Sequence, residues 1–130
     1  MMDHTHKAFD SDLQELGRMV AEMGGLAEQQ IVDAIDALSR RDLTVAQRVI
    51  AGDARIDVLQ REVESRAILT IARRQPMAVD LREVVGALRI SNDLERIGDL
   101  AKNIAKRVVA LDSEFLTQKV MRGVEHMTEL

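Results

Sequence analysis

Residues 87–111 read ALRISNDLERIGDLAKNIAKRVVAL, and this stretch decides the fold. Apolar residues recur along it in alternating steps of three and four, the spacing that lines up side chains on one side of an α-helix. The seam predicted to face a core is Ala87, Ile90, Leu94, Ile97, Ala101, Ile104, Val108 and Leu111. A seam sustained in this way is typical of helices packed side by side in a bundle.

A first helix is predicted to begin near Ser11 or Asp12. Asp12 and Glu15 have the spacing of a capping box, in which each side chain satisfies a free backbone N–H at a helix start. The inward stripe of this helix is Leu16, Val20, Met23, Ala27, Ile31, Ile35 and Leu38. Its steps of three and four indicate an amphipathic helix.

A second helix is predicted over about residues 43–74. Asp42 has the residue type of an N-cap, and Gln75-Pro76 ends the helix because proline disfavours helix in the residue before it. The inward stripe is Val49, Ile56, Leu59, Val63, Ala67 and Ile71. Asp80 and Glu83 form another capping-box pair, which opens the helix that contains residues 87–111.

Three long amphipathic helices with short links predict an all-α fold, an antiparallel three-helix bundle over residues 1–112. Residues 113–130 are predicted to form a partial fourth helix with Ser113 as its N-cap. The apolar spacing of Val120, Val124, Met127 and Leu130 repeats that of Leu16, Val20, Met23 and Leu26. We therefore interpret 113–130 as the first helix of an incomplete second repeat, in a fragment of a longer protein.

The composition excludes several classes of protein. Lys and Arg number 18 against 22 Asp and Glu, a net charge of -4, and aromatic residues make up 2%. Nucleic-acid binding, which needs basic patches or stacking platforms, is therefore not expected. The absence of cysteine excludes disulfides and thiolate metal ligands. No apolar run reaches the roughly 20 residues that cross a bilayer, and residues 1–9 lack the pattern of a signal peptide, so we expect a cytoplasmic protein.

Two pairs of acidic residues share the spacing i, i+4: Asp53 with Asp57, and Glu95 with Asp99. This spacing stacks both carboxylates on one side of a helix, where like charges repel unless a cation lies between them. The first pair lies 24 and 20 residues before Met77, which is near the predicted turn, and the second lies 18 and 22 residues after it. At ~1.5 Å rise per residue, antiparallel helices bring all four carboxylates into one layer about 30 Å from that turn.

The two pairs face in different directions. Asp53 falls inside the apolar arc of its helix, where a carboxylate is expected to be paired or to coordinate a metal. Glu95 and Asp99 lie away from the predicted seam, so the pattern favours a site at the bundle surface. Its all-oxygen donors suit hard cations such as Fe, Mn, Mg or Ca, with Zn as a further candidate. In the alternative interpretation, Lys102 and Lys106 balance a solvated pair, and Asp53 pairs with an arginine.

Five short motifs occur in order along residues 8–130. They are Met23-Gly24-Gly25-Leu26-Ala27-Glu28-Gln29-Gln30, Val49-Ile50-Ala51-Gly52-Asp53 with Ile56-Asp57, Arg73-Arg74-Gln75-Pro76, Asp80-Leu81-Arg82, and Asp93-Leu94-Glu95-Arg96-Ile97-Gly98-Asp99 followed by Lys102-Asn103-Ile104. Together they resemble a repeat of the PhoU family, whose members couple phosphate uptake to phosphate-starvation signalling. Several motifs in the right order make the resemblance specific.

The resemblance implies two tandem three-helix bundles that bind multinuclear metal clusters, iron being one type, through Glu/Asp-x-x-x-Asp motifs. By position, the candidate ligands here are Asp53, Asp57, Glu95 and Asp99. The resemblance also implies a negative regulator, without catalysis, that bridges the phosphate ABC transporter with its ATPase subunit and a phosphate-sensing histidine kinase. These partners alone would bring it to the membrane. Because the second bundle is almost wholly missing, we expect exposed surface that favours a homodimer.

Two other functions are open at this point. The first is a metal-free helical adaptor that binds partners through its surface helices. The second is a di-iron carboxylate enzyme, which is disfavoured because no Glu in the chain is followed by His three residues later. His4, His6 and His126 are interpreted as bystanders, in the amino-terminal tail and in the last helix.

Overall fold

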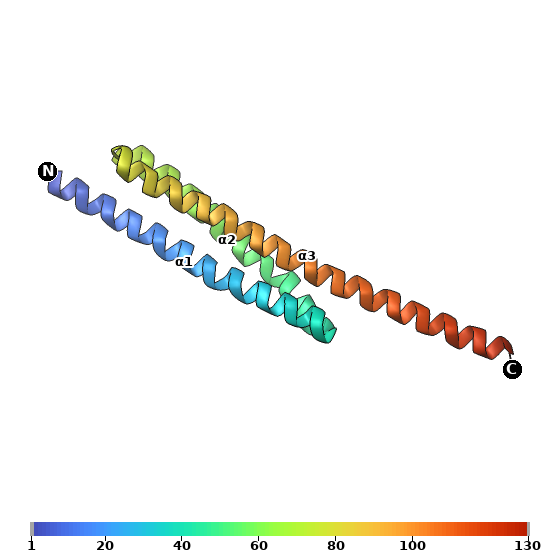
Figure 1. The fold of residues 1–130 in the computed structure, drawn as a ribbon. Coiled ribbons are helices and arrows are strands. Elements are labelled where there is room, and N and C mark those ends of the chain that lie inside the picture. Colours follow the sequence, from blue (N-terminus) through green and yellow to red (C-terminus); the bar gives the residue numbers. More distant parts are fainter. Residues whose placement is uncertain (1, 130) are drawn as a thin grey trace.

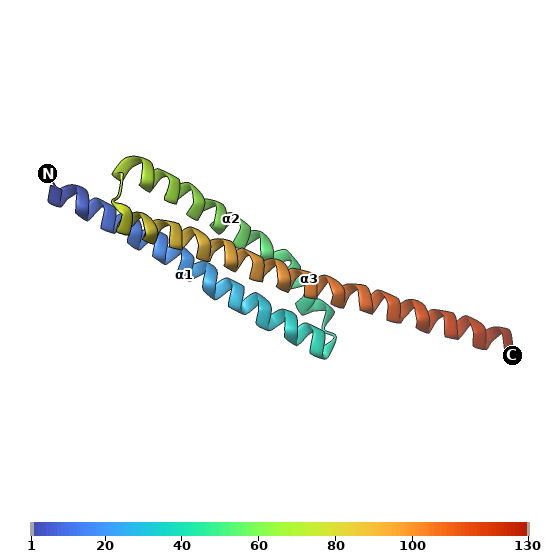
Figure 2. The same cartoon turned by 45° about the horizontal axis from the view of Figure 1, so that its top comes forward.

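The computed structural model is a bundle of three helices: α1 (Met2–Arg40), α2 (Leu43–Arg74) and α3 (Ala78–Glu129). The structure describes the backbone of residues 2–129 and the side chains of residues 7–128. Each helix packs against both others, and consecutive helices run in opposite directions (Figure 1, Figure 2). The predicted all-α three-helix bundle is confirmed.

The two ends of α2 follow the local sequence. The Asp42 Oδ1 atom accepts a hydrogen bond from the Val45 backbone N–H at 3.1 Å, which satisfies a donor that the first turn leaves free. At the other end, Gln75 adopts the left-handed conformation with φ 45°, and its N–H donates to the Ile71 carbonyl. Pro76 then follows and cannot continue the helix. Both predicted ends of α2 are confirmed.

The predicted start of α1 is wrong, because the helix extends back to Met2. Phe9 is buried in the core and Leu13 packs against it, so burial stabilises turns that precede the predicted capping box. Asp12 lies inside the helix, where its Oδ2 atom accepts a hydrogen bond from Arg74 Nε at 3.0 Å. A contact between α1 and α2 has replaced the local cap.

The predicted boundaries of α3 also need correction. The helix begins at Ala78, so Asp80 lies in its first turn instead of capping it. At the other end, residues 113–129 are helical as predicted, but they continue α3 without a break. Ser113 is not an N-cap: its carbonyl accepts a hydrogen bond from Thr117 Oγ1 at 3.0 Å within the helix. Neither glycine nor proline occurs near Ser113 to stop the helix. The assignment of 113–130 to a second repeat stays a prediction, and residue 130 lies outside the described residues.

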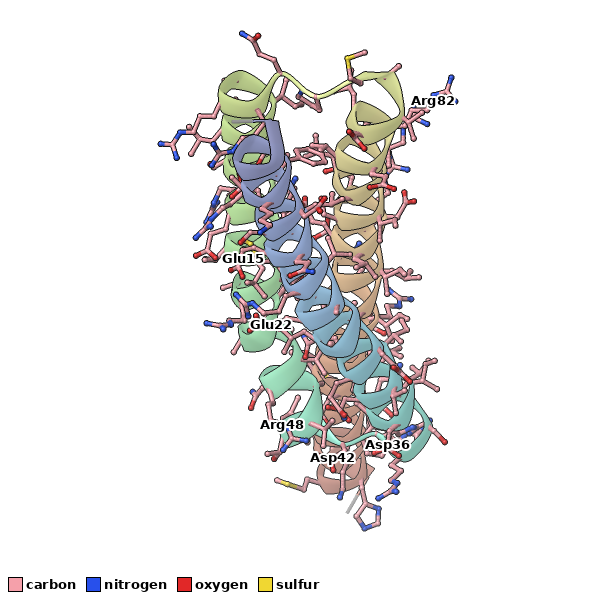
Figure 3. The ribbon with its side chains drawn as sticks, turned by 90° about the vertical axis from the view of Figure 1, so that its left-hand side faces the viewer. Glu15, Glu22, Asp36, Asp42, Arg48 and Arg82 are labelled. Atoms are coloured by element: carbon pink, nitrogen blue, oxygen red, sulfur yellow. The ribbon has the colours of Figure 1, made fainter. Side chains whose placement is uncertain are left out.

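The core has two clusters that differ in the size of their side chains. The large-residue cluster, toward the α2–α3 turn, is Phe9, Leu16, Met19, Met23, Ala27, Ile56, Leu59, Val63, Ala67 and Val84. The alanine cluster, toward the α1–α2 turn, is Ala34, Ala37, Ala46, Val49, Ala101, Ala105 and Val108. Figure 3 places Arg82 at the first of these ends and Asp36 and Asp42 at the second. Beyond the alanine cluster, the last part of α3 projects past the α1–α2 turn (Figure 1, Figure 2).

The seam of α3 differs from the predicted one at three of its eight positions, while Ile104 packs against the alanine cluster. Ile90, Ile97 and Leu111, predicted to face the core, are exposed. The fully interior positions are Val84, Ser91, Gly98, Ala101, Ala105 and Val108. Small residues thus occupy places one residue after the predicted isoleucines. The helices can approach closely along small side chains, and the large ones then lie at the rim of the interface.

The carboxyl half of α1 shows the same correction. Leu16, Met23 and Ala27 are buried as predicted. Ile35 and Leu38, by contrast, are 55% and 45% exposed, while the alanines at 34 and 37 are fully buried. Apolar periodicity predicted the helix correctly. It assigned the large residues Ile35 and Leu38 to the core, whereas the neighbouring alanines face the core.

Candidate metal centre

Helix α2 contributes Asp53 and Asp57. Asp53 faces inward as predicted, with 2% of its surface exposed, because its place in the helix continues the buried stripe between Val49 and Ile56. Asp57 follows one turn later and is half-buried. A charge as deeply buried as that of Asp53 requires a counter-charge or a metal.

Helix α3 contributes Glu95, which is half-buried, and Asp99, which is exposed. Both therefore lie at the edge of the α2–α3 interface. Gly98 brings this edge close to α2: a Cβ atom built there would lie 3.2 Å from Asp53 Oδ1 and 3.1 Å from Ile56 Cδ1. The missing side chain at position 98 allows the two acidic pairs to approach each other.

Three of the four predicted carboxylates converge. One oxygen atom from each of Asp53, Asp57 and Asp99 lies within 4.8 Å of the other two. Oxygens on opposite sides of a bound Mg²⁺ or Ca²⁺ ion are about 4 to 5 Å apart, so the spacing fits a hard cation. The common layer of α2 and α3 that residue counting predicted is therefore present. Glu95, the fourth predicted ligand, lies one turn before Asp99 and outside this close group.

The four carboxylates carry more negative charge than the neighbouring lysine can neutralise. Burial raises the pKa of Asp53, and the neighbouring Asp57 and Asp99 raise it further, against the opposing effect of Lys102. The pKa of Glu95 is also raised, first by burial and then by the three other carboxylates. Glu95 therefore interacts electrostatically with Asp53, Asp57 and Asp99, although it lies outside the close group. A bound cation would offset the part of both pKa shifts that comes from the neighbouring carboxylates.

A lysine and an unpartnered oxygen complete the group. The Lys102 Nζ atom lies 3.5 Å from Asp53 Oδ2. Asp53 Oδ1 is buried and has no hydrogen-bond partner among the described residues. The partner of Asp53 is thus a lysine, not the arginine of the alternative interpretation. An orphaned carboxylate oxygen facing two further carboxylates fits the donor set of a metal, and the choice of metal ligands itself stays a prediction.

Sequence reasoning treated Lys102 as a surface charge and gave Gly98 no role. The signal for Lys102 was its position three residues after Asp99, on the same side of the helix. Of the three histidines, His126 is exposed and lies about 40 Å along α3 from Asp99. The side chains of His4 and His6 are outside the described residues.

The same segment matches known proteins. The model of the PhoU domain matches residues 20–108, a range that includes both acidic pairs and both core clusters except Phe9, Leu16 and Met19. The chain belongs to the PhoU family. No helix of this PhoU chain within residues 2–129 has both the length and the apolar character needed to cross a bilayer.

Curated relatives are 40–51% identical to this chain over the aligned residues. It is 51% identical over 131 residues to the phosphate-specific transport system accessory protein PhoU homolog of Rhizobium meliloti (strain 1021), with 99% of this chain and 55% of the relative covered. It is 49% identical over 130 residues to the homolog of Caulobacter vibrioides (strain NA1000 / CB15N), with 100% and 56% covered. The accessory protein PhoU of Edwardsiella tarda is 40% identical over 103 residues, with 79% and 42% covered.

The chain spans about half the length of the curated relatives that it matches. PhoU proteins are accessory and regulatory proteins, not enzymes, so membership of the family confirms the prediction that no catalysis takes place.

Proposed function

We propose that this chain is a metal-binding regulatory accessory protein of phosphate uptake. The observation that carries the proposal is the convergence of three carboxylates within 4.8 Å, around a buried oxygen of Asp53 that has no hydrogen-bond partner in the described part of the chain. The relatives in Rhizobium and Caulobacter, which are named accessory proteins of the phosphate-specific transport system, support the biological setting.

Asp53, Asp57, Glu95 and Asp99 hold the metal, which is Fe, Mn, Mg or Zn. Donor sets made only of carboxylate oxygens favour hard cations. Two ligands come from each of two helices, so a bound cation ties α2 to α3. It also offsets the negative charge that raises the pKa of Asp53.

The regulatory part of the proposal concerns the partners. The chain acts in the cytoplasm as a negative regulator of the phosphate-starvation response. It contacts the ATPase subunit of the phosphate ABC transporter and the phosphate-sensing histidine kinase, reaches the membrane through them only, and forms a homodimer. Exposed apolar side chains such as Met77, Ile90 and Ile97 provide surface for these contacts.

Metal analysis of protein purified without chelator tests the proposal. We expect at least one ion per chain in the wild type and loss of bound metal in both Asp53→Ala and Glu95→Ala, because ligands from both helices share one site. Glu62→Ala is the matched control, since Glu62 is an exposed carboxylate of α2 that lines the groove toward α1. Less than one ion per chain, unchanged by the substitutions, would contradict metal binding.

A metal-free helical adaptor is the second candidate. It is favoured by one observation, the ion pair between Lys102 and Asp53, because this pair already neutralises part of the buried charge without a metal. The same metal analysis decides between the two candidates.

A further inference from the structure

Lys102 is the basic side chain that reaches into the acidic cluster. It lies on α3, three residues after Asp99, and its Nζ atom crosses the interface to Asp53 on α2 at 3.5 Å. Lys102 is 32% exposed and Asp53 only 2%. Water therefore screens this pair less than it screens an exposed surface pair, and the charges interact more strongly.

The ammonium group of Lys102 pairs with one of the two carboxylate oxygens of Asp53. The ammonium faces Oδ2, and no side chain or backbone group within the described residues bonds to Oδ1. Four carboxylates against one ammonium leave a formal charge of -3 when all are ionised (-4 + 1). Arg61 also acts on Glu95, but its side chain is exposed. Lys102 is thus the positive charge that any incoming cation meets at Asp53.

We infer that Lys102 is a resident counter-ion that sets the metal affinity of the site. This inference rests on the metal binding proposed above and adds a residue that is not itself a ligand. A protonated lysine offers three N–H donors and no lone pair, so it cannot coordinate a metal. Instead, the ammonium group forms an ion pair with Asp53 in the metal-free protein, and an incoming cation has to overcome its repulsion.

Two opposite effects follow from the same charge. In the metal-free protein, the ion pair gives Asp53 a partner and links α2 to α3, so it stabilises the bundle. During metal binding, the ammonium repels the incoming cation and competes for the oxygens of Asp53, so it weakens binding. A residue with a purely structural role would not produce the second effect.

Substitution of Lys102→Met removes the charge and keeps a long, unbranched side chain. We expect the dissociation constant for Mn²⁺, measured by isothermal titration calorimetry, to become about tenfold tighter or more. The thermal midpoint of the same variant in EDTA should fall, because Asp53 loses its ion-pair partner.

Two control variants test whether the effect needs a positive charge at position 102 itself. Lys106→Met makes the same change in net charge one turn further along α3, at an exposed residue, and should leave both measurements close to the wild-type values. Lys102→Arg keeps the positive charge and should also bind Mn²⁺ with nearly the affinity of the wild type.

The outcomes distinguish this inference from the proposed function. A wild type that takes up no Mn²⁺ or other metal overturns the metal site, and the inference with it. If the wild type binds Mn²⁺, a Lys102→Met variant that binds no more tightly overturns the role of Lys102 alone. A Lys102→Met variant that is as stable as the wild type in EDTA also overturns the role of Lys102. Tighter binding together with a lower midpoint, absent in Lys106→Met, establishes it.

Discussion

The two core clusters bury side chains of different size, and the acidic group lies at the boundary between them. Leu16, Met23 and Ile56 of the large-residue cluster are fully buried, and their burial supplies hydrophobic free energy. The alanine cluster buries little side-chain surface, but alanines let three helix axes approach one another. Asp53 lies between Val49 of the alanine cluster and Ile56 of the large-residue cluster. At Gly98 a built Cβ would lie 3.2 Å from Asp53 Oδ1, so a small residue at the boundary between the clusters lets carboxylates of two helices come together.

The largest expected effect tests the large-residue cluster. Leu16→Ala should lower the free energy of unfolding by about 2 to 5 kcal/mol, because it removes buried methyl groups and leaves a cavity. Ile35→Ala is the control: this residue of α1 is exposed, so its truncation should change stability by no more than about 0.5 kcal/mol. Urea denaturation measures both. An Ile35→Ala variant as unstable as Leu16→Ala would restore the seam that periodicity predicted.

A smaller effect tests the close approach of α2 and α3. Gly98→Ala should cost about 1 to 3 kcal/mol and weaken Mn²⁺ binding, because the new Cβ crowds Asp53 Oδ1 and Ile56 Cδ1. Gly25→Ala is the matched control on α1, since a Cβ there meets nothing within 4 Å. It should stabilise the helix by up to about 1 kcal/mol. Equal effects of the two substitutions on metal binding would argue against a role for the spacing at Gly98.

The smallest expected effect concerns the charge of Asp53 in the metal-free protein. The pKa of Asp53 is raised by burial and by the facing Asp57 and Asp99, against Lys102, so the folded state binds this proton more tightly than the unfolded state does. The ionised carboxylate therefore costs stability, and this cost appears as the pH rises from the ordinary value of 3.8 through the raised pKa. Asp53→Asn removes the cost.

Thermal midpoints in EDTA measure this contribution. Asp53→Asn should be slightly more stable than the wild type at neutral pH, and the difference should disappear below pH 3.8, where Asp53 is protonated in both states. In the presence of Mn²⁺ the order should reverse, because only the wild type gains stability from the metal. A substitution that destabilises the chelated protein at neutral pH would mean that the ion pair with Lys102 outweighs the cost of burial.

Much of the fold could be predicted because it depends on local chemistry. The Asp42 cap and the Gln75-Pro76 stop fix the ends of α2 within the sequence itself. The register of α2 and α3 also follows from the sequence, since a short turn and a constant rise per residue place Asp57 and Asp99 at one height.

Other features could not be read from local patterns. The start of α1 depends on the burial of Phe9 and on the ion pair between Asp12 and Arg74, both of which are contacts with other helices. The continuity of α3 through Ser113 was missed for a related reason: serine and aspartate are good caps but are also tolerated inside a helix.

By itself, the sequence determined that this protein has three long helices, that α2 turns an aspartate inward, and that two acidic pairs share one layer. Only the tertiary structure decided which stripe of α3 is interior. Hydropathy favours Ile90 and Ile97, but the space between packed helices favours Ser91 and Gly98. The physical reason is that periodicity records how apolar a side chain is, whereas packing also depends on how near the neighbouring backbone lies. That nearness sets Gly98 against Asp53, and the pairing of Asp53 with Lys102 likewise exists only once the helices are packed.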